Sequence, residues 1–272
     1  MNKYVKYIII GIIAVSLSAI LYQPNEKQIQ QNLRDYEDIL QSGVLRAVTE
    51  YNSLNFFVSD DSIAGFHYEL LKAFTKDKGL ILEIEPIMNL EERWEGIRSG
   101  KYDLLANDVL RISDRKDSIL FTHPIMLSKQ VLVQRKPQTD NDSLYIKNHL
   151  DLAHKTLHIV KDSPYKLRIE NLSNEIGDTI YVAEVEKYGA EQLLALVAYG
   201  DIDYAVCDER IAQAAINDYP QLDINTPISF TQFNSWGVYN HNTALLDTLN
   251  TWLDYYIQTP AFKRLKMKYN KN

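Results

Sequence analysis

Short apolar runs alternate along most of this chain with stretches in which apolar residues recur at helical spacing. Residues 44–48 and 80–87 predict strands, and residues 65–78 between them predict an amphipathic helix. The second half repeats the alternation, with strands predicted over 156–160 and 179–185. Strands that alternate with helices in this way predict an α/β fold in which helices flank the sheets.

Two segments of the chain carry nearly the same pattern. Residues 97–108 and 197–208 each read as the end of a helix, a glycine, a short turn and an apolar strand that ends in a polar pair containing an aspartate. Gly100 and Gly200 suit a left-handed residue just after a helix. A unit used twice predicts two similar lobes, although any α/β protein can repeat such a unit. Ligands of open α/β sheets bind beyond the carboxyl ends of the strands, so two facing lobes would form a cleft.

The N-terminus has the pattern of an export segment. Lys3 and Lys6 precede an uncharged apolar run over residues 7–22. We interpret residues 1–22 as a signal peptide or, in preference, an uncleaved membrane anchor, because small residues suited to a cleavage site are poorly placed. The positive-inside rule then puts both lysines in the cytoplasm and the rest of the chain on the periplasmic side of the inner membrane. Residues 23–42 predict a polar tether with one short helix.

The remaining pattern predicts two lobes joined by two crossings. Residues 43–135 and 227–272 are assigned to lobe 1, and residues 136–226 to lobe 2. The polar segment 136–142 marks the first crossing near residue 135, and the second crossing falls near residue 226. We expect each lobe to be a mainly parallel sheet flanked by helices, with two crossover strands as a hinge on which rigid lobes close.

Composition and charge restrict the class of protein. The formal net charge is −7 and no basic stripe with interleaved aromatics occurs, which argues against nucleic-acid binding. The single cysteine, Cys207, falls in a predicted buried strand and cannot form an internal disulfide. His154 and His158 straddle a predicted strand start, so we expect no metal site and no cofactor. No nucleophile elbow or phosphate loop is present, and we expect no catalytic residues and no enzyme activity.

The order of these elements resembles the family 3 solute-binding proteins, which have a two-lobe periplasmic-binding-protein fold, over about residues 42–269. The segments that carry the resemblance are 43–46, 65–70, 99–104, 113–115 and 240–269. Within that family the chain is most similar to the N-terminal binding domain of membrane-bound lytic transglycosylase F, through the spacing from Asp103 to Arg115. The catalytic domain that follows in those transglycosylases is not expected here, because the sequence ends at Asn272.

The resemblance implies a ligand site between the lobes. Arg115 would hold a ligand carboxylate through a bidentate, charge-assisted pair, with a surface position as the alternative. Asp208 would bind a ligand amino group, and it also suits a helix N-cap. Asp108 stands where small residues are usual in the family, so it would neutralise an arginine or receive a cationic group. Packing is the alternative for Phe56 and Trp236, and helix capping is the alternative for Ser163. The other predicted ligand contacts, these three included, are Asn107, Tyr51, Asn52, Ser53, Phe56, Ser163 and Trp236.

These features predict an extracytoplasmic protein that binds a small ligand, amino-acid-like or derived from peptidoglycan, between its lobes. Its expected partners are that small molecule, the inner membrane through the N-terminal segment, and a permease or a cell-wall enzyme, with no nucleic acid. One alternative is a ligand-sensing, non-catalytic regulatory or interaction subunit for a cell-wall lytic enzyme. Another is a glycan-cleaving enzyme that uses Asp108 and Asp208, which would face each other across the predicted cleft.

Overall fold

The computed structural model of this chain describes residues 33–60, 62–110, 118–139, 142–187 and 189–269, with the backbone alone at 108–110. Residues 33–272 belong to one compact unit. Within the described ranges, no helix combines the length and the apolar character that crossing a membrane requires. The predicted export segment 1–22 and the first ten residues of the predicted tether, 23–32, lie outside the described residues.

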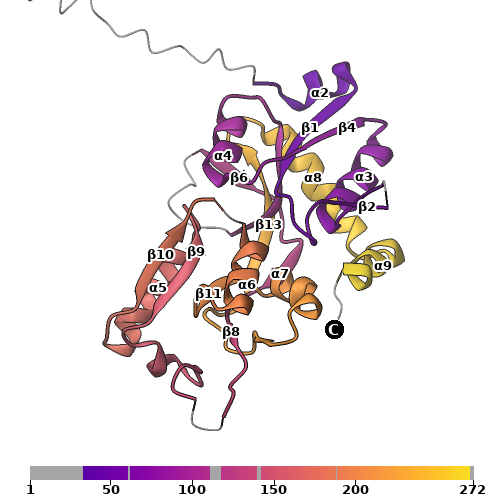
Figure 1. Cartoon of the computed structure of the whole chain (residues 1–272). Helices are drawn as coiled ribbons and strands as arrows, with labels where there is room; N and C mark the ends of the chain where they lie inside the picture. Colours follow the sequence, from indigo (N-terminus) through magenta and orange to yellow (C-terminus); the bar gives the residue numbers. More distant parts are fainter. Residues whose placement is uncertain (1–32, 61, 111–117, 140–141, 188, 270–272) are drawn as a thin grey trace, which may run out of the picture. The chain divides into compact units, whose positions relative to one another are not determined.

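The first sheet combines strands from the two ends of the described chain (Figure 1). Its order is β4 (Ile81–Pro86), β1 (Val44–Thr49), β5 (Leu104–Leu110), β13 (Gln232–Tyr239) and β6 (Ile119–Phe121), and β7 (Met126–Ser128) also pairs with β13. The first three strands are parallel, whereas β13 runs antiparallel to all of its partners. The late strand β13 therefore completes a sheet that the N-terminal half begins, which makes this lobe discontinuous in sequence.

Four longer helices accompany this sheet: α3 (Phe66–Lys78), α4 (Leu90–Arg98), α8 (Thr243–Tyr256) and α9 (Pro260–Tyr269). The apolar stripe predicted for residues 65–78 is confirmed, because Phe66, Leu70, Leu71 and Phe74 of α3 are completely buried. A small hairpin of β2 (Phe57–Ser59) and β3 (Ser62–Ala64) precedes α3. Between hairpin and helix, Gly65 has a φ of 133°, and a Cβ there would lie 2.3 Å from the Asn55 carbonyl oxygen. Only glycine lets the loop after β1 lie this close to the start of α3.

The second sheet has the order β10 (Tyr181–Val185), β9 (Thr156–Val160), β11 (Ala205–Asp208), β8 (Gln130–Arg135) and β12 (Leu222–Asp223). It is also parallel over three strands, β10, β9 and β11, and antiparallel beyond them. Its helices are α5 (Tyr165–Ile176), α6 (Ala190–Tyr199), α7 (Glu209–Ala215), η2 (His149–Leu152) and η3 (Ile216–Asp218). Two sheets with the same parallel core agree with the predicted repetition of one α/β unit.

The chain passes between the two sheets at places that differ in part from the sequence prediction. We expected residues 130–135 to end lobe 1, but β8 is hydrogen-bonded within the second sheet, to β11 and β12. The first passage therefore lies at Lys129, between β7 and β8. An apolar run such as Val131–Val133 predicts a buried strand without saying which sheet it joins. The return passage lies between β12 and β13.

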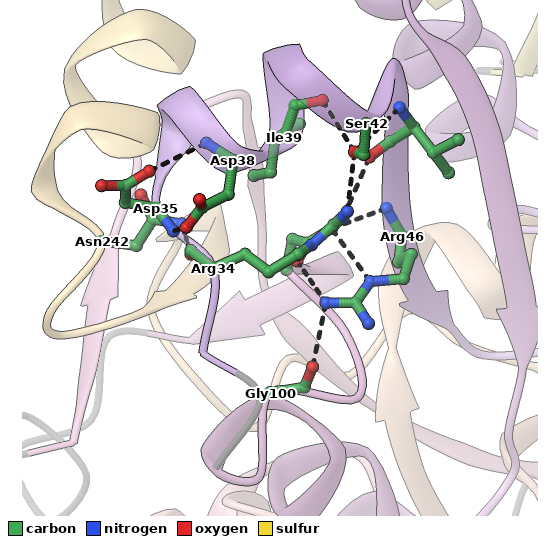
Figure 2. A network of polar contacts seen from close by, with 10 residues as sticks. Arg34, Asp35, Asp38, Ile39, Ser42, Arg46, Gly100 and Asn242 are labelled. Atoms are coloured by element: carbon green, nitrogen blue, oxygen red, sulfur yellow. Dashed lines mark hydrogen bonds and ion pairs between the residues drawn. The ribbon is translucent and has the colours of Figure 1, made fainter.

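The last residues of the predicted tether belong to the folded unit. Helix α2 (Tyr36–Ser42) starts with a capping box in which Asp35 accepts a hydrogen bond from the Asp38 backbone N–H at 2.9 Å. Ile39 of this helix is completely buried. Just before it, Arg34 reaches the carboxylate of Asp103, which also pairs with Arg46 at 2.9 Å (Figure 2). These contacts attach Arg34 and the start of α2 to Asp103, the residue directly before β5.

Two residues singled out from the sequence lie in the core. Cys207 is completely buried in β11, as predicted, and burial raises the pKa of its thiol. Trp236 is completely buried in β13, and its Nε1–H donates to Nδ1 of the buried His67 at 2.8 Å. Trp236 thus packs inside lobe 1 instead of lining the predicted cleft, because its single polar atom is satisfied by a core histidine.

Candidate functional site

A cleft of about 740 Å³ opens between residues of the two sheets. Glu50 follows the last residue of β1, Val160 ends β9, and Asn107 lies in the middle of β5. The cleft is therefore at the carboxyl ends of parallel strands, where ligands of open α/β sheets bind. Its volume falls within the range of small-molecule sites. The other lining residues are Leu90, Glu91, Arg93, Trp94, Arg98, Ser118, Ile119, Lys161, Asp162, Ser163, Pro164, Tyr165, Lys166, Leu167, Glu170, Ala190 and Ile211.

A buried ion pair forms part of the lobe 1 wall. Arg93 of α4 donates from Nη2 to Oε2 of Glu50 at 3.3 Å, and its Nη1 donates to the carbonyl oxygens of Ile87 at 2.5 Å and Met88 at 3.2 Å. Burial lowers the pKa of the Arg93 guanidinium, and the attraction of Glu50 opposes that shift. This pair was not predicted from the sequence. Glu50 lies two residues after the predicted strand 44–48, just before the predicted ligand contact Tyr51, and that position was the signal available.

Asn107 is one of the predicted residues that does reach the cleft. Its side chain is buried, and its Oδ1 has no hydrogen-bond partner among the described residues. A buried amide oxygen without a partner costs stability, so such an atom in a cleft wall is suited to accept a hydrogen bond from a ligand.

The lobe 2 wall is the turn from β9 into α5. Ser163 lines the cleft as predicted, and its Oγ accepts a hydrogen bond from the Tyr165 backbone N–H at 3.3 Å. Ser163 is not the cap residue of α5, because the N-cap position is held by Pro164. Two lysines on this wall are paired away from lobe 1, Lys161 with Glu186 at 2.6 Å and Lys166 with Glu184 at 3.1 Å.

Apolar surface separates the charged groups of the cleft. Leu90 and Trp94 of α4 lie on the lobe 1 side, and Pro164, Tyr165 and Leu167 lie on the lobe 2 side. Charged side chains of both signs together with aromatic and aliphatic surface suit a small, partly apolar ligand that carries its own charges.

Asp208 is buried at the point where β11 gives way to α7. Its Oδ1 accepts a hydrogen bond from the Arg210 backbone N–H at 2.8 Å and lies 3.5 Å from Arg210 Nε. This is the N-cap role that the sequence analysis kept as an alternative. Asp208 does not belong to the cleft lining, although Ile211 of the same helix does.

The predicted ligand contacts after β1 form a compact loop. Asn52 is buried, and its Oδ1 accepts from the backbone N–H groups of Leu54 at 3.1 Å and Asn55 at 2.7 Å. Phe56 is buried and packs edge-on against Tyr51 and Tyr68. Asn52 and Phe56 therefore have structural roles in the loop. Tyr51, in contrast, is exposed.

Two predicted residues cannot be placed in the site. Arg115 lies outside the described residues, and the backbone of Asp108 lies in β5 while its side chain is not described. Their proposed roles toward a ligand therefore remain predictions. Among the described side chains, no group of three or more His, Cys, Asp or Glu residues is arranged to hold a metal ion.

The described fold resembles solved binding proteins. A mutant of ArgBP from T. maritima superposes with a TM-score of 0.74 at 22% identity, covering 87% of this chain and 99% of that one. An ancestral amino acid-binding protein, a precursor of cyclohexadienyl dehydratase, gives a TM-score of 0.72 at 19% identity and covers 86% of this chain and 99% of its own. At these identities the likeness establishes the two-lobe fold alone.

Sequence relatives are longer proteins. The membrane-bound lytic murein transglycosylase F of Pseudomonas fluorescens strain Pf-5 is 27% identical over 241 residues, which are 86% of this chain and 47% of the relative. The protein of the same name from Desulfosudis oleivorans is 25% identical over 240 residues, which are 88% of this chain and 51% of the relative. The chain thus spans about half the length of these relatives.

A family model matches most of the chain. The bacterial extracellular solute-binding proteins, family 3, match over residues 45–272, which include both sheets and every helix named above except α2. The chain belongs to this family of solute-binding proteins.

Proposed function

We propose that this protein is an extracytoplasmic, non-catalytic binding protein that holds a small ligand between its two lobes. The observation that carries the proposal is the cleft of about 740 Å³, to which both lobes contribute charged and aromatic side chains. The ligand class that fits is amino-acid-like or derived from peptidoglycan, because such molecules combine carboxylate and ammonium groups with an apolar part. In this proposal Arg115 holds a carboxylate and Asn107 accepts a hydrogen bond.

Calorimetry and thermal unfolding of the full chain test this function. The ligands are a panel of free amino acids and a panel of muropeptide fragments. A ligand that binds the native state stabilises it by about 2.7 kcal/mol at one hundred times its Kd. Asn107→Ala should weaken the binding, whereas Glu175→Ala, on the exposed side of α5 and outside the cleft lining, should leave it unchanged. No heat and no thermal shift with any member of either panel would contradict the proposal.

A second function is favoured by the sequence relatives. The chain matches about half of proteins named membrane-bound lytic murein transglycosylase F, so it corresponds to one part of those proteins. We propose as the second candidate that it senses a ligand and regulates a separate cell-wall lytic enzyme. Adding the full chain to a purified lytic transglycosylase should then change the release of soluble peptidoglycan fragments, in a way that depends on muropeptide. An unchanged rate together with no co-purification would exclude this candidate.

The non-catalytic part of the proposal has its own test. The full chain incubated alone with peptidoglycan should release no soluble fragments. Release that is lost in Asp208→Asn would instead indicate a glycan-cleaving enzyme.

The proposed location also has a test. We propose that residues 1–22 tether the protein to the inner membrane with the binding unit on the periplasmic side. Protease added to intact spheroplasts should then degrade the binding unit.

A further inference from the structure

Ser53 and Glu191 join the two lobes across the edge of the cleft. The Ser53 backbone N–H donates to Oε1 of Glu191 at 2.7 Å, and the Ser53 hydroxyl donates to the same oxygen. Ser53 lies in the loop after β1 of the first sheet, and Glu191 lies in the first turn of α6, which packs on the second sheet. Both hydrogen-bond donors of Ser53, which the sequence analysis assigned to a ligand, are thus used by a carboxylate of the opposite lobe.

The lobe 1 side of this contact is fixed in advance. Asn52 and Phe56 exchange two backbone hydrogen bonds, at 3.1 and 3.3 Å, which close the loop around Ser53. Asn52 Oδ1 caps the two N–H groups that follow Ser53. The Ser53 N–H therefore has a set direction before Glu191 approaches, so little conformational freedom is lost when the contact forms.

The lobe 2 side is equally well suited to the contact. Glu191 lies in the first turn of α6, where the helix dipole favours a negative charge. The residue before the helix is Gly189, and a Cβ there would lie 2.5 Å from Met88 Cε and 3.8 Å from Glu50 Oε1. The start of α6 therefore lies close to the lobe 1 residues Met88 and Glu50, the second of which lines the cleft. Ala190, the next residue, lines the cleft itself.

We propose that Glu191 is a positioning residue that latches the two lobes together without help from a ligand. The latch consists of Ser53 and Glu191. A hydrogen bond to a charged group contributes more than a neutral one, and here one carboxylate oxygen receives two. Because the latch supplies part of the free energy of lobe closure, a ligand that needs the closed state binds more tightly than it would without the latch. This inference goes beyond the proposed function and concerns the ligand-free protein.

Single-molecule FRET on the ligand-free full chain tests the latch. Cysteines introduced at the exposed positions Lys76 of lobe 1 and Asn174 of lobe 2 carry the dyes, since the native Cys207 is completely buried. Wild type should show mainly the closed distance. Glu191→Ala should raise the open-to-closed ratio by about tenfold or more. Ser53→Ala, which keeps the backbone N–H, should raise it less, and the double variant should add little to Glu191→Ala alone.

The control is Glu175→Ala, which removes a lobe 2 glutamate that pairs within its own helix with Arg168 at 2.6 Å. It should leave the distance distribution as in wild type. Circular dichroism of each variant checks that it is folded, and Glu191→Gln supplies a second, milder latch variant. The same distance distribution in Glu191→Ala and wild type, or an open wild type, would overturn the latch. Since no ligand is added, this outcome is separate from failure of the ligand-binding tests, which would overturn only the proposed function.

Discussion

Residues 97–108 of the first lobe and 197–208 of the second form the same local structure. Each passes from a helix through a left-handed glycine into a buried strand, with a φ of 74° at Gly100 and 86° at Gly200. In each, an arginine from a neighbouring strand holds the turn. Arg46 of β1 donates to the Gly100 carbonyl at 3.0 Å, and Arg135 of β8 donates to the Val197 carbonyl at 2.9 Å. Similar sequence therefore gives similar geometry in the two lobes.

The aspartates of the two turns differ in environment. The Asp103 side chain is 2% exposed, pairs with Arg34 and Arg46, and accepts the Arg46 backbone N–H at 2.8 Å. The Asp203 side chain is 49% exposed, and its one ion pair among the described residues is with Arg135. The difference arises because Arg34, which also donates to Ser42 of α2, reaches the Asp103 carboxylate, while the second turn faces solvent. The contribution of the turn aspartate to stability is therefore set by its burial and its partners, and not by the repeated sequence pattern.

The strand ends differ as well. β11 stops at Asp208, which caps α7, whereas the backbone of β5 continues past Asp108 to Leu110. In lobe 2 the terminal aspartate is engaged with its own helix. In lobe 1, Asn107, the residue before Asp108, lies in the cleft wall. The two repeated segments therefore contribute differently to the cleft.

The largest effect that we predict separates the two turn aspartates. Asp103→Ala should lower the free energy of unfolding by about 3 kcal/mol, because two partly buried arginines lose their shared carboxylate. Asp203→Ala is the matched control and should cost about 0.5 kcal/mol, as expected of an exposed pair. Urea unfolding of the two variants measures both values. Equal costs would show that the burial of Asp103 and its pairing with Arg34 do not matter.

The next effect concerns the ligand and the segment that follows β5. Arg115→Ala should weaken carboxylate binding by at least about 2 kcal/mol, because a charged partner is removed. Arg115→Lys should also weaken it, since the bidentate fork is lost. Calorimetry with a ligand found in the panels gives the affinities.

Unchanged affinity in Arg115→Ala would mean that this arginine does not hold the ligand in this chain. Asp108 would then be expected to neutralise it already. In that case Asp108→Gly should create or strengthen carboxylate binding.

Alkaline pH should lower the stability of the folded protein through Tyr204, which lies in the repeated segment 197–208 of lobe 2. Burial raises the pKa of Tyr204 to about 12. A folded-state pKa above the unfolded value of about 10 means that stability is fully present below pH 10 and is lost as the pH rises toward 12. The loss amounts to about 1.4 kcal/mol at pH 11. Urea unfolding at pH 9 and pH 11 measures it, and Tyr204→Phe should lack this part of the pH dependence.

The smallest effect tests the shared glycine geometry. Gly200→Ala should cost about 1 kcal/mol from the left-handed backbone alone, since the nearest atom to an added Cβ is Arg135 Nη1 at 3.9 Å. Gly65→Ala should cost clearly more, because its Cβ would meet backbone atoms. Thermal unfolding compares the two, and a Gly200→Ala variant as stable as wild type would contradict the role assigned to this glycine.

The sequence alone determined the elements and the kind of fold. Apolar periodicity placed α3 and the strands of the repeated units, and a glycine marked the end of each unit's helix, because these features depend on neighbouring residues. The resemblance carried by short segments such as 99–104 then indicated the two-lobe family. It also indicated strand ends as the place of the cleft, and two of the predicted ligand contacts, Asn107 and Ser163, line that cleft.

Only the tertiary structure decided which groups meet. The ion pair of Arg93 with Glu50 joins residues 43 positions apart, and the contact of Ser53 with Glu191 spans 138 positions. It also placed β8 in the second sheet, α2 in the first lobe and Trp236 in the core. A sequence pattern states that a side chain is to be buried or paired, but the partner is fixed by how distant strands and helices pack against one another.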